Sequence, residues 1–594
     1  MTTDNTKDAA QGKRGGAKRR SMSLYAEGEP MLWLTGGMLG TALLMIVFML
    51  AYVAFMGAMN FWPLAIAQVR TLTGDTYLGE VTRAQTFEPS AAQLAPLPEA
   101  HRGQIRARLA EQDGVAQRRL YRTGNYDLTG TRFHWVPDYA IEEETYPEWA
   151  IAFERMEWGN FYGFPLAFIV DGETVAEDPA AIWEQFQRYH PEVRRRWRER
   201  KRLETRDIGR ANRDEERARL TFVDIERAHN QGRATAEALE ASREAYQTTL
   251  TRVRQDHARI TDAIRALNAE NARYAMLMRT MDGREKALHL ADVVRAHPAN
   301  RLSFAQKVGV FLSRWREFLL DDPREANQEG GVFPAIIGTV TMTLVMTLFV
   351  VPFGVLAALY LREYAKSGPM VSSVRIAINN LAGVPSIVFG VFGLGFFCYI
   401  FGGYLDEWFY AARLPAPTFR KGGVLWSSLT LALLTLPVVI VATEEALAAV
   451  PGSMREGSYA CGASKWQTIK RIVLPRAMPG IMTGMILAMA RGAGEVAPLM
   501  LVGAVKLAPD LPVDFTNWTG SFGPIPTGPI HLDRSFMHLG FHIYDVGFQS
   551  PDSEAARPMV FTTTLLLIGI IVALNIGAMI LRSKLRKRFM TGAF

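Results

Sequence analysis

The sequence predicts a mainly α-helical, polytopic membrane protein with six transmembrane helices and a largely helical domain, containing a coiled coil, outside the membrane. Three observations predict this class. Six apolar stretches, each of about 20 residues or more, are long enough to cross a bilayer. A long insert between the first and second stretches is rich in Arg, Glu and Ala, which favour helix. Part of that insert repeats apolar residues at alternating steps of three and four, as a coiled coil does.

The expected spans follow one another along the chain of 594 residues, at 31–56, 335–360, 376–401, 424–447, 480–505 and 559–581. The first span follows residues 1–30, which are polar and are expected to form a disordered basic tail in the cytoplasm. At about 26 residues, the first span is longer than the apolar core of a signal peptide, so an uncleaved anchor is expected.

Basic residues predict the orientation, because cytoplasmic loops carry an excess of Lys and Arg. Basic clusters precede the first span and follow the last one: Lys13, Arg14, Lys18, Arg19 and Arg20, then Arg582, Lys584, Arg586, Lys587 and Arg588. Both termini and the loop 448–479 are therefore expected in the cytoplasm. The insert 57–330 is expected outside, and the remaining residues, 331–594, are expected to form the main transmembrane domain.

The insert carries two local signals. An apolar run at 162–170, followed by Asp171 and Gly172, is typical of a strand that leads into a turn. A coiled coil is expected over about 205–287. Its main seam consists of Leu250, Val253, His257, Ile260, Ile264, Leu267, Asn271, Tyr274, Met278 and Met281. Asparagine at such a position, here Asn271, commonly fixes register or oligomeric state.

A second, weaker seam precedes Gly232 and consists of Ile208, Ala211, Ala218, Phe222 and Ile225. The two seams predict an antiparallel helical hairpin that turns at 230–232. One long solvent-exposed helix is the alternative.

Composition excludes several classes of function. The net charge of +7 is spread along the chain without a nucleic-acid-binding motif, so no nucleic-acid partner is expected. The two cysteines, Cys398 in an expected span and Cys461 in a loop, are expected to lie too far apart to pair. The ten histidines form no metal-ligand cluster and no Walker A sequence is present. The chain itself is therefore expected to bind no metal and no cofactor, and not to be an enzyme.

The stretch at 455–503 joins a basic loop to an apolar helix. A helix is expected at 459–473, because apolar residues fall on one face of it: Tyr459, Ala463, Trp466, Ile469 and Val473. Pro475 is expected to end this helix, and Pro479 to begin the next one, which becomes the fifth span.

This loop resembles the signature of ABC-importer permeases, in which Glu-Ala-Ala, three residues, Gly, nine residues and Ile-x-Leu-Pro follow one another. The matching residues are Glu456, Gly462, Ile472, Leu474 and Pro475, while Gly457 and Ser458 replace the two alanines. Three further stretches resemble phosphate permease subunits of the PstA type: NLAGVPSIVFG at 380–390, PGIMTG at 479–484 and ARGAGEVAPL at 490–499.

The resemblance implies a type I importer fold for 331–594, in the cytoplasmic (inner) membrane of a bacterium. It also implies the partners: a second permease subunit (PstC-like), two ATPase subunits (PstB-like) that hold ATP and Mg, an extracytoplasmic phosphate-binding protein (PstS-like) and membrane lipid. The loop would dock in an ATPase subunit through its signature residues together with Lys465 and Trp466. An amphipathic helix that rests on the membrane surface is the alternative.

Four polar residues are candidates for a substrate path: Arg491 and Glu495 in the fifth span, and Asn380 and Ser386 beside the sequence GVPS in the third. A charge at the bilayer centre costs about 2.5–3.5 kcal/mol, so something must compensate for it. Arg491 and Glu495 are four residues apart and can pair, and the planar fork of an arginine matches an oxyanion. The alternatives are a structural ion pair and, at GVPS, a packing kink.

The expected function is that of a permease subunit in ATP-driven import of inorganic phosphate by alternating access. Two other functions stay open: a permease for another oxyanion, such as sulfate or molybdate, and an envelope sensor or scaffold that the membrane helices only anchor. The spacing from Gly462 to Pro475 and the presence of Arg491 argue against a mere anchor.

Overall fold

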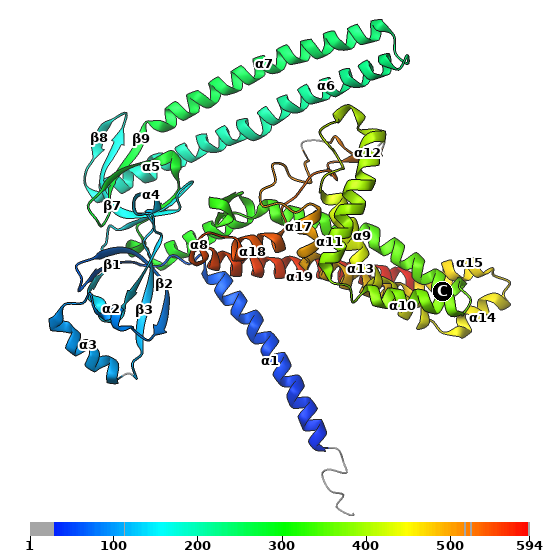
Figure 1. Ribbon diagram of the computed structural model, residues 1–594, viewed down its shortest axis with the longest axis horizontal. Helices are drawn as coiled ribbons and strands as arrows, with labels where there is room; N and C mark the ends of the chain where they lie inside the picture. Colours follow the sequence, from blue (N-terminus) through cyan, green and yellow to red (C-terminus); the bar gives the residue numbers. More distant parts are fainter. Residues whose placement is uncertain (1–28, 112, 516–517, 523–524, 592–594) are drawn as a thin grey trace, which may run out of the picture. The chain divides into compact units, whose positions relative to one another are not determined.

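A computed structural model describes residues 29–591 apart from 112, 516–517 and 523–524 (Figure 1). The expected tail up to residue 28, with its basic cluster, lies outside the described residues, as do the side chains of Arg586, Lys587 and Arg588. The chain divides into two compact units, Met1–Met56 and Gly57–Phe594. The described part of the first unit is helical and belongs to α1 (Glu29–Met59), whose last three residues fall in the second unit.

Six helices in the described residues are long and apolar enough to cross a membrane: Met31–Met59, Phe333–Tyr364, Ser386–Phe409, Val424–Ala448, Lys465–Gly494 and Ser553–Lys584. They comprise α1; α9 (Phe333–Leu359) with the π turn η6 (Tyr360–Tyr364); α11 (Ser386–Phe392) with η7 (Gly393–Phe401) and α12 (Gly402–Phe409); α13 (Val424–Ala448); α15 (Lys465–Thr468) with η9 (Ile469–Val473) and α16 (Leu474–Gly494); and α19 (Ser553–Thr591). The expected number of spans is confirmed, and two of their positions need correction.

The third span begins at Ser386, so the expected start at 376 is wrong. Helix α10 (Pro369–Leu381) ends before it, and α11 starts only after Pro385. Pro385 itself is extended (φ −56°, ψ 136°). A proline also disfavours the helical conformation of the residue before it, so the chain cannot pass through this point as one helix.

The fifth span runs from Lys465 to Gly494, so the expected bounds 480–505 are wrong. Pro475 and Pro479 lie within this continuous helix and neither ends nor begins it. Just before Pro475, the π turn η9 already interrupts the regular hydrogen-bond pattern of the helix. The proline has no N–H to donate, and at this point its absence disrupts no additional regular turn. The helix stops where Glu495 becomes extended (φ −77°, ψ 139°).

Small residues bring the central spans α9, α13 and α16 close together. A Cβ atom added at Gly484 of α16 would lie 2.6 Å from the Cβ atom of Ala442 on α13. One added at Gly354 of α9 would lie 2.6 Å from Cγ1 of Val439, also on α13. Such close approach of backbones is the usual way in which helices associate within a bilayer.

The insert contains two antiparallel sheets that the sequence analysis did not predict. One has the strand order β4-β3-β2-β1-β5, and the other has the order β10-β9-β7-β6-β11 with β8 paired to β7. Their strands are β1 (Ile66–Thr71), β2 (Thr76–Phe87), β3 (Ala116–Arg122), β4 (Phe133–Pro137), β5 (Ile141–Thr145), β6 (Ile151–Arg155), β7 (Asn160–Val170), β8 (Glu173–Ala176), β9 (Tyr274–Arg279), β10 (Glu285–His289) and β11 (Val293–His297). The strand expected at 162–170 is confirmed as β7, and Asp171 and Gly172 form the turn after it with φ values of 57° and 84°.

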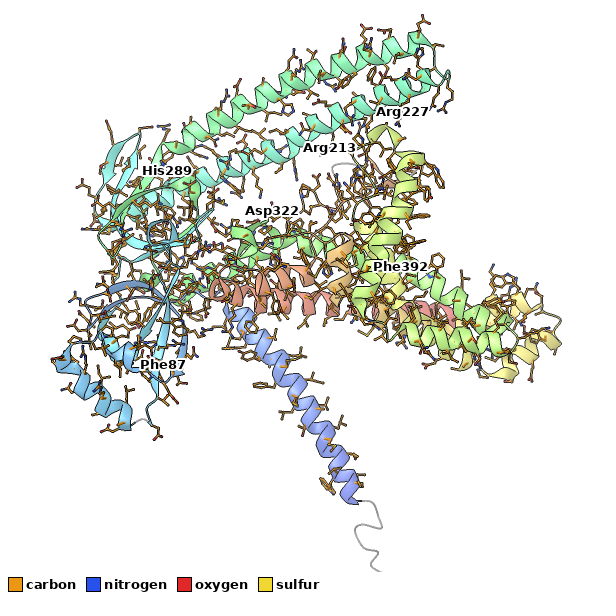
Figure 2. All side chains as sticks on the ribbon, viewed as in Figure 1. Phe87, Arg213, Arg227, His289, Asp322 and Phe392 are labelled. Carbon is orange, nitrogen blue, oxygen red and sulfur yellow. The ribbon has the colours of Figure 1, made fainter. Side chains whose placement is uncertain are left out.

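Helices α6 (Ile208–Asn230) and α7 (Ala236–Ala272) form an antiparallel hairpin that turns at Gly232, where φ is 71° (Figure 1). Figure 2 shows Arg213 and Arg227 along α6. The expected coiled coil ends too late, because residues after 272 leave the helix and enter β9.

The remaining α-helices are α2 (Ala91–Leu94), α3 (Glu99–Glu111), α4 (Tyr126–Thr129), α5 (Pro179–Arg202), α8 (Phe304–Leu320), α14 (Gly452–Ala460), α17 (Ala497–Val502) and α18 (Leu539–Phe548). The chain also forms two small two-stranded sheets: β12 (Pro323–Arg324) with β13 (Glu329–Gly330), and β14 (Gly520–Phe522) with β15 (Ile525–Gly528).

One turn joins the insert to the transmembrane domain. Its residues Glu325, Ala326 and Asn327 have successive positive φ values of 46°, 52° and 73°, which non-glycine residues rarely adopt. On one side, the Glu325 carboxylate accepts hydrogen bonds from Arg132 (3.1 Å) and from the Gly159 amide (3.2 Å).

On the other side of this turn, Nδ2 of Asn327 donates to the Lys506 carbonyl (3.1 Å) and to the Asp545 carboxylate (3.2 Å). Lys506 follows α17 and Asp545 lies on α18, so both acceptors belong to the transmembrane domain. Bonds on both sides hold the turn in a conformation that is costly for the backbone alone.

Candidate functional site

The loop between α13 and α16 forms two helices and a tight turn. Helix α14 ends at Ala460, and Gly462 follows with a φ of 80°. The amide of Ala463 donates to the Ser458 carbonyl (3.1 Å), which is the usual way to close a helix end on a glycine. The single helix expected at 459–473 is therefore wrong, because Gly462, close to its expected start, follows the end of one helix and precedes the next.

The next helix starts with its own cap. Oγ of Ser464 accepts from the Gln467 amide (3.3 Å), and Oε1 of Gln467 accepts from the Ser464 amide (2.9 Å). This reciprocal pair is a capping box, which satisfies two amides at a helix start. The loop consequently presents α14 and α15 as two separately closed segments.

The predicted coupling residues divide into two groups. Glu456, Gly462, Lys465 and Trp466 are exposed, and Trp466 keeps 55% of its surface. Ile472, Leu474 and Pro475 are half-buried. The exposed group is free to meet another molecule, while the half-buried group contributes to the start of the fifth span.

A buried apolar cluster supports this loop from the membrane side. It contains Leu359 of α9, Leu447 and Val450 at the end of α13, and Ile469 and Val473 of η9, all at most 7% exposed. Through this cluster, the loop is in apolar contact with three spans.

Arg491 and Glu495 form the ion pair that the sequence predicts. Arg491 lies in the last turn of α16 and Glu495 directly follows that helix. Nε of Arg491 and Oε1 of Glu495 are 3.6 Å apart, with 35% and 22% of the two side chains exposed. Among the residues that the structure describes, Arg491 has no hydrogen-bond acceptor, so its fork keeps donors for a ligand.

The structure separates the other two path candidates. Ser386 is half-buried at the start of α11, which packs against α17: a Cβ atom added at Gly390 would lie 2.7 Å from Cα of Pro498. Ser386 thus begins a helix that neighbours the segment directly after Glu495. Asn380 is exposed on α10, which packs against α13.

Sequence reasoning missed two polar groups because their members are far apart in the chain. One is the pair of Lys506 and Asp545 (3.1 Å), where the Asp545 side chain is only 2% exposed. The other is an ion pair between Arg455 and Glu363, which are separated by 92 residues. Helical periodicity relates residues three or four apart and gives no signal for such pairs.

The chain is similar in sequence to a known family of transport proteins. The pattern of the family described as "Binding-protein-dependent transport system inner membrane component" matches residues 350–590. The phosphate transport system permease protein PstA of Mycobacterium leprae is 39% identical over 198 residues, covering 33% of this chain and 58% of that protein. The probable ABC transporter permease protein YqgI of Bacillus subtilis is 32% identical, and the match covers 38% of this chain and 70% of that protein. The phosphate transport system permease protein PstA 2 of Mycobacterium bovis is 34% identical, covering 41% and 69%.

The match spans 58% to 70% of the length of these three relatives. Among solved structures, the inward-facing MetNI methionine ABC transporter is 16% identical, covers 42% of this chain and 94% of its own, and has a TM-score of 0.29. The bacterial alginate ABC transporter in complex with a pentasaccharide-bound periplasmic protein is 16% identical, covers 48% and 90%, and has a TM-score of 0.30.

Proposed function

Because the chain belongs to the binding-protein-dependent transport system inner membrane components, as a PstA-type permease subunit of ABC transporters, we propose that it imports inorganic phosphate. The chain is a multi-pass membrane protein and is not itself an enzyme, since ATP hydrolysis in this family takes place in partner subunits. The relatives named as phosphate permeases support the substrate, and the pair of Arg491 and Glu495 is the observation that carries it.

The chemistry of this pair suits an anion such as phosphate. A planar guanidinium offers parallel donors that match two oxygens of a phosphate group. Glu495 lies 3.6 Å from Arg491 and offsets its charge, so that an anion would be held loosely enough to leave. Ser386 would add a hydroxyl near the same path from the start of α11.

The cytoplasmic loop is the proposed contact with an ATPase subunit. Its exposed residues Glu456, Gly462, Lys465 and Trp466 would dock in that subunit, and the apolar cluster above them would pass its movement to α9, α13 and α16. The complex would further contain a PstC-like permease subunit, two PstB-like ATPase subunits that hold ATP and Mg, and a PstS-like binding protein that delivers phosphate.

The proposed location is the bacterial cytoplasmic membrane, with both termini in the cytoplasm and the insert 57–330 outside. Arg455, Lys465, Lys470 and Arg471 lie in the loop that meets the ATPase, which agrees with the excess of basic residues on cytoplasmic sides.

Uptake by cells that lack this chain tests the substrate. Phosphate uptake should fall while sulfate uptake stays unchanged, and the wild-type chain should restore it. Arg491→Lys should not restore it, whereas Arg471→Lys, at an exposed position in the loop, should. Unchanged phosphate uptake with reduced sulfate or molybdate uptake would assign another oxyanion, and unchanged uptake of all three would favour a sensor or scaffold.

A further inference from the structure

Arg455 lies where three elements of the transmembrane domain meet. It belongs to α14, and its Nη1 donates to the Val450 carbonyl (2.7 Å). Its Nη2 donates to the Leu447 carbonyl (2.9 Å) and to the Glu363 carboxylate (3.0 Å). The side chains of Arg455 and Glu363 are only 19% and 9% exposed.

Each acceptor of Arg455 ends a membrane span. Leu447 lies in the last turn of α13 and Val450 follows its end, where carbonyls lack partners inside the helix and the helix dipole favours a positive charge. Glu363 lies in η6, the π turn that ends α9. One guanidinium therefore connects the loop to the ends of two different spans.

Arginine is required for this arrangement because of its shape. Three acceptors are served by two nitrogens of one rigid plane, and a lysine ammonium presents its donors from a single point. A lysine at this position would keep the charge and lose the simultaneous contacts.

The loop is also tied together internally. Oγ of Ser458 on α14 and Oγ1 of Thr468 on α15 share a hydrogen bond of 2.8 Å. The Nζ atom of Lys465 lies 5.0 Å from the centre of the Tyr364 ring, which belongs to η6. Both segments of the loop thus contact the end of α9, but only Arg455 does so through a partly buried ion pair.

We infer that Arg455 is a positioning residue that makes the cytoplasmic loop, α9 and α13 move as one body, an inference that rests on the proposed docking of the loop in an ATPase subunit. The apolar cluster alone would let the loop slide over the helix ends, since its contacts are non-directional. The directed bonds of Arg455 fix the angle between the loop and the two spans. When ATP binding displaces the loop, α9 and α13 are then displaced by the same amount, and the movement reaches the substrate path.

A distance measurement tests this inference without regard to the substrate. The native Cys461 is exposed in the loop and Cys398 is buried, so Cys461 takes one nitroxide label. The second label goes on Leu356→Cys, since Leu356 of α9 is 63% exposed. In the assembled complex, the distance between the labels should stay the same when ATP and vanadate trap the ATPase subunits. In Arg455→Lys, the distribution of label-to-label distances should be broader in the ATP-free complex, and its mean should shift when the ATPase subunits are trapped.

Arg375→Lys is the matched control. Arg375 pairs with Glu444 at 3.5 Å between α10 and α13, with 43% of the arginine side chain exposed, and this pair does not involve the loop. The control should keep the narrow distance. A distance that shifts on trapping with Arg455 intact, or that is the same in Arg455→Lys, would overturn the inference.

Transport measured per ATP separates positioning from a merely structural role. In liposomes, Arg455→Lys should retain ATP hydrolysis and lose about tenfold in phosphate moved per ATP, because charged hydrogen bonds are lost. A parallel fall in assembly, hydrolysis and transport would mean that Arg455 only stabilises the fold. If the intact complex moves no phosphate, the proposed substrate is wrong, and the label distances still decide the role of Arg455.

Discussion

Arg491 and Glu495 place two opposite charges where the fifth span ends. If Arg491 binds the anion, Arg491→Lys should reduce phosphate uptake about tenfold or more although the charge is kept, because lysine lacks the bidentate fork. Glu495→Gln should also impair uptake by leaving the arginine unbalanced. Uptake assays on cells with equal amounts of each variant in the membrane measure both effects.

The double variant Arg491→Met, Glu495→Met distinguishes a path from a structural ion pair. Removing one partner of a partly buried pair destabilises a protein, whereas removing both restores much of the stability. A site in the path predicts that the double variant assembles normally and moves no phosphate. Recovery of uptake would show that the pair serves packing, and the path would then centre on Ser386.

His297 is a residue for which the structure predicts an effect of pH on stability. It is 2% exposed at the end of β11, and neither ring nitrogen has a hydrogen-bond partner in the described part of the chain. Burial, together with Arg314 and Arg295 and against the opposing effect of Glu154, lowers the pKa of His297 to about 3. The folded chain therefore holds this ring neutral, while the unfolded chain protonates it below about pH 6.5.

Protons bind preferentially to the unfolded state between these two values, so stability falls as the pH drops through that window. At pH 5, His297 should lower the free energy of unfolding by about 2 kcal/mol relative to pH 8. Thermal unfolding midpoints of the purified protein at both pH values measure this, with His297→Phe as the comparison. An equally large decrease in His297→Phe would mean that other groups cause it.

At the scale of elements, Gly462 separates the two segments of the loop. A Cβ atom added at Gly462 would meet nothing within 4 Å, so close approach of another backbone does not account for this glycine. The φ of 80° explains the glycine instead. Gly462→Ala should destabilise the loop by about 1 kcal/mol and weaken co-purification of the ATPase subunit.

Gly457→Ala provides the control for this prediction. Gly457 lies within α14, has no positive φ and has open space at its Cβ position, so alanine should be tolerated or mildly stabilising. Equal ATPase recovery with both variants would contradict the importance of the turn at Gly462.

Element boundaries are one part of the fold that the sequence does not predict. The apolar seam predicted for the coiled coil continues past the end of α7 to Tyr274 and Met278. It does so because a step of four residues keeps two side chains on one face of a helix and also on one face of a strand. Pro475 looked like a helix end because sequence rules assume a regular turn before it, and the structure has a π turn there. Apolar composition alone was sufficient to predict the spans that contain α1, α9, α13 and α19.

The sheets of the insert were missed for a related reason. Their pairing is between distant residues, such as β6 with β11, and their strands lack a long alternating pattern. The same limit applies to the site: spacing of four residues predicted the pair of Arg491 and Glu495, while the contacts of Arg455 and Asn327 depend on tertiary structure.

For the whole molecule, topology is the property that the proposed function depends on most. A membrane-impermeant maleimide should label Ser242→Cys on α7 in intact cells, because the insert is proposed to lie outside. Native Cys461, exposed in the loop, should react only after the cells are opened. Ser453→Cys should follow Cys461. The opposite pattern would reverse the orientation and remove the loop from the side where ATP is available.

The turn at 325–327 bears on how this chain can be engineered. Excision of the insert would take away Asn327, whose amide satisfies Asp545, and would leave that almost fully enclosed carboxylate with Lys506 alone. A carboxylate that loses a partner inside a protein is costly, so a trimmed permease needs a neutral residue in place of Asp545. Transplanting the insert onto another permease would require Lys506 and Asp545 to travel with it. The insert is contiguous in sequence, but a transferable unit built from it must also include residues of α18.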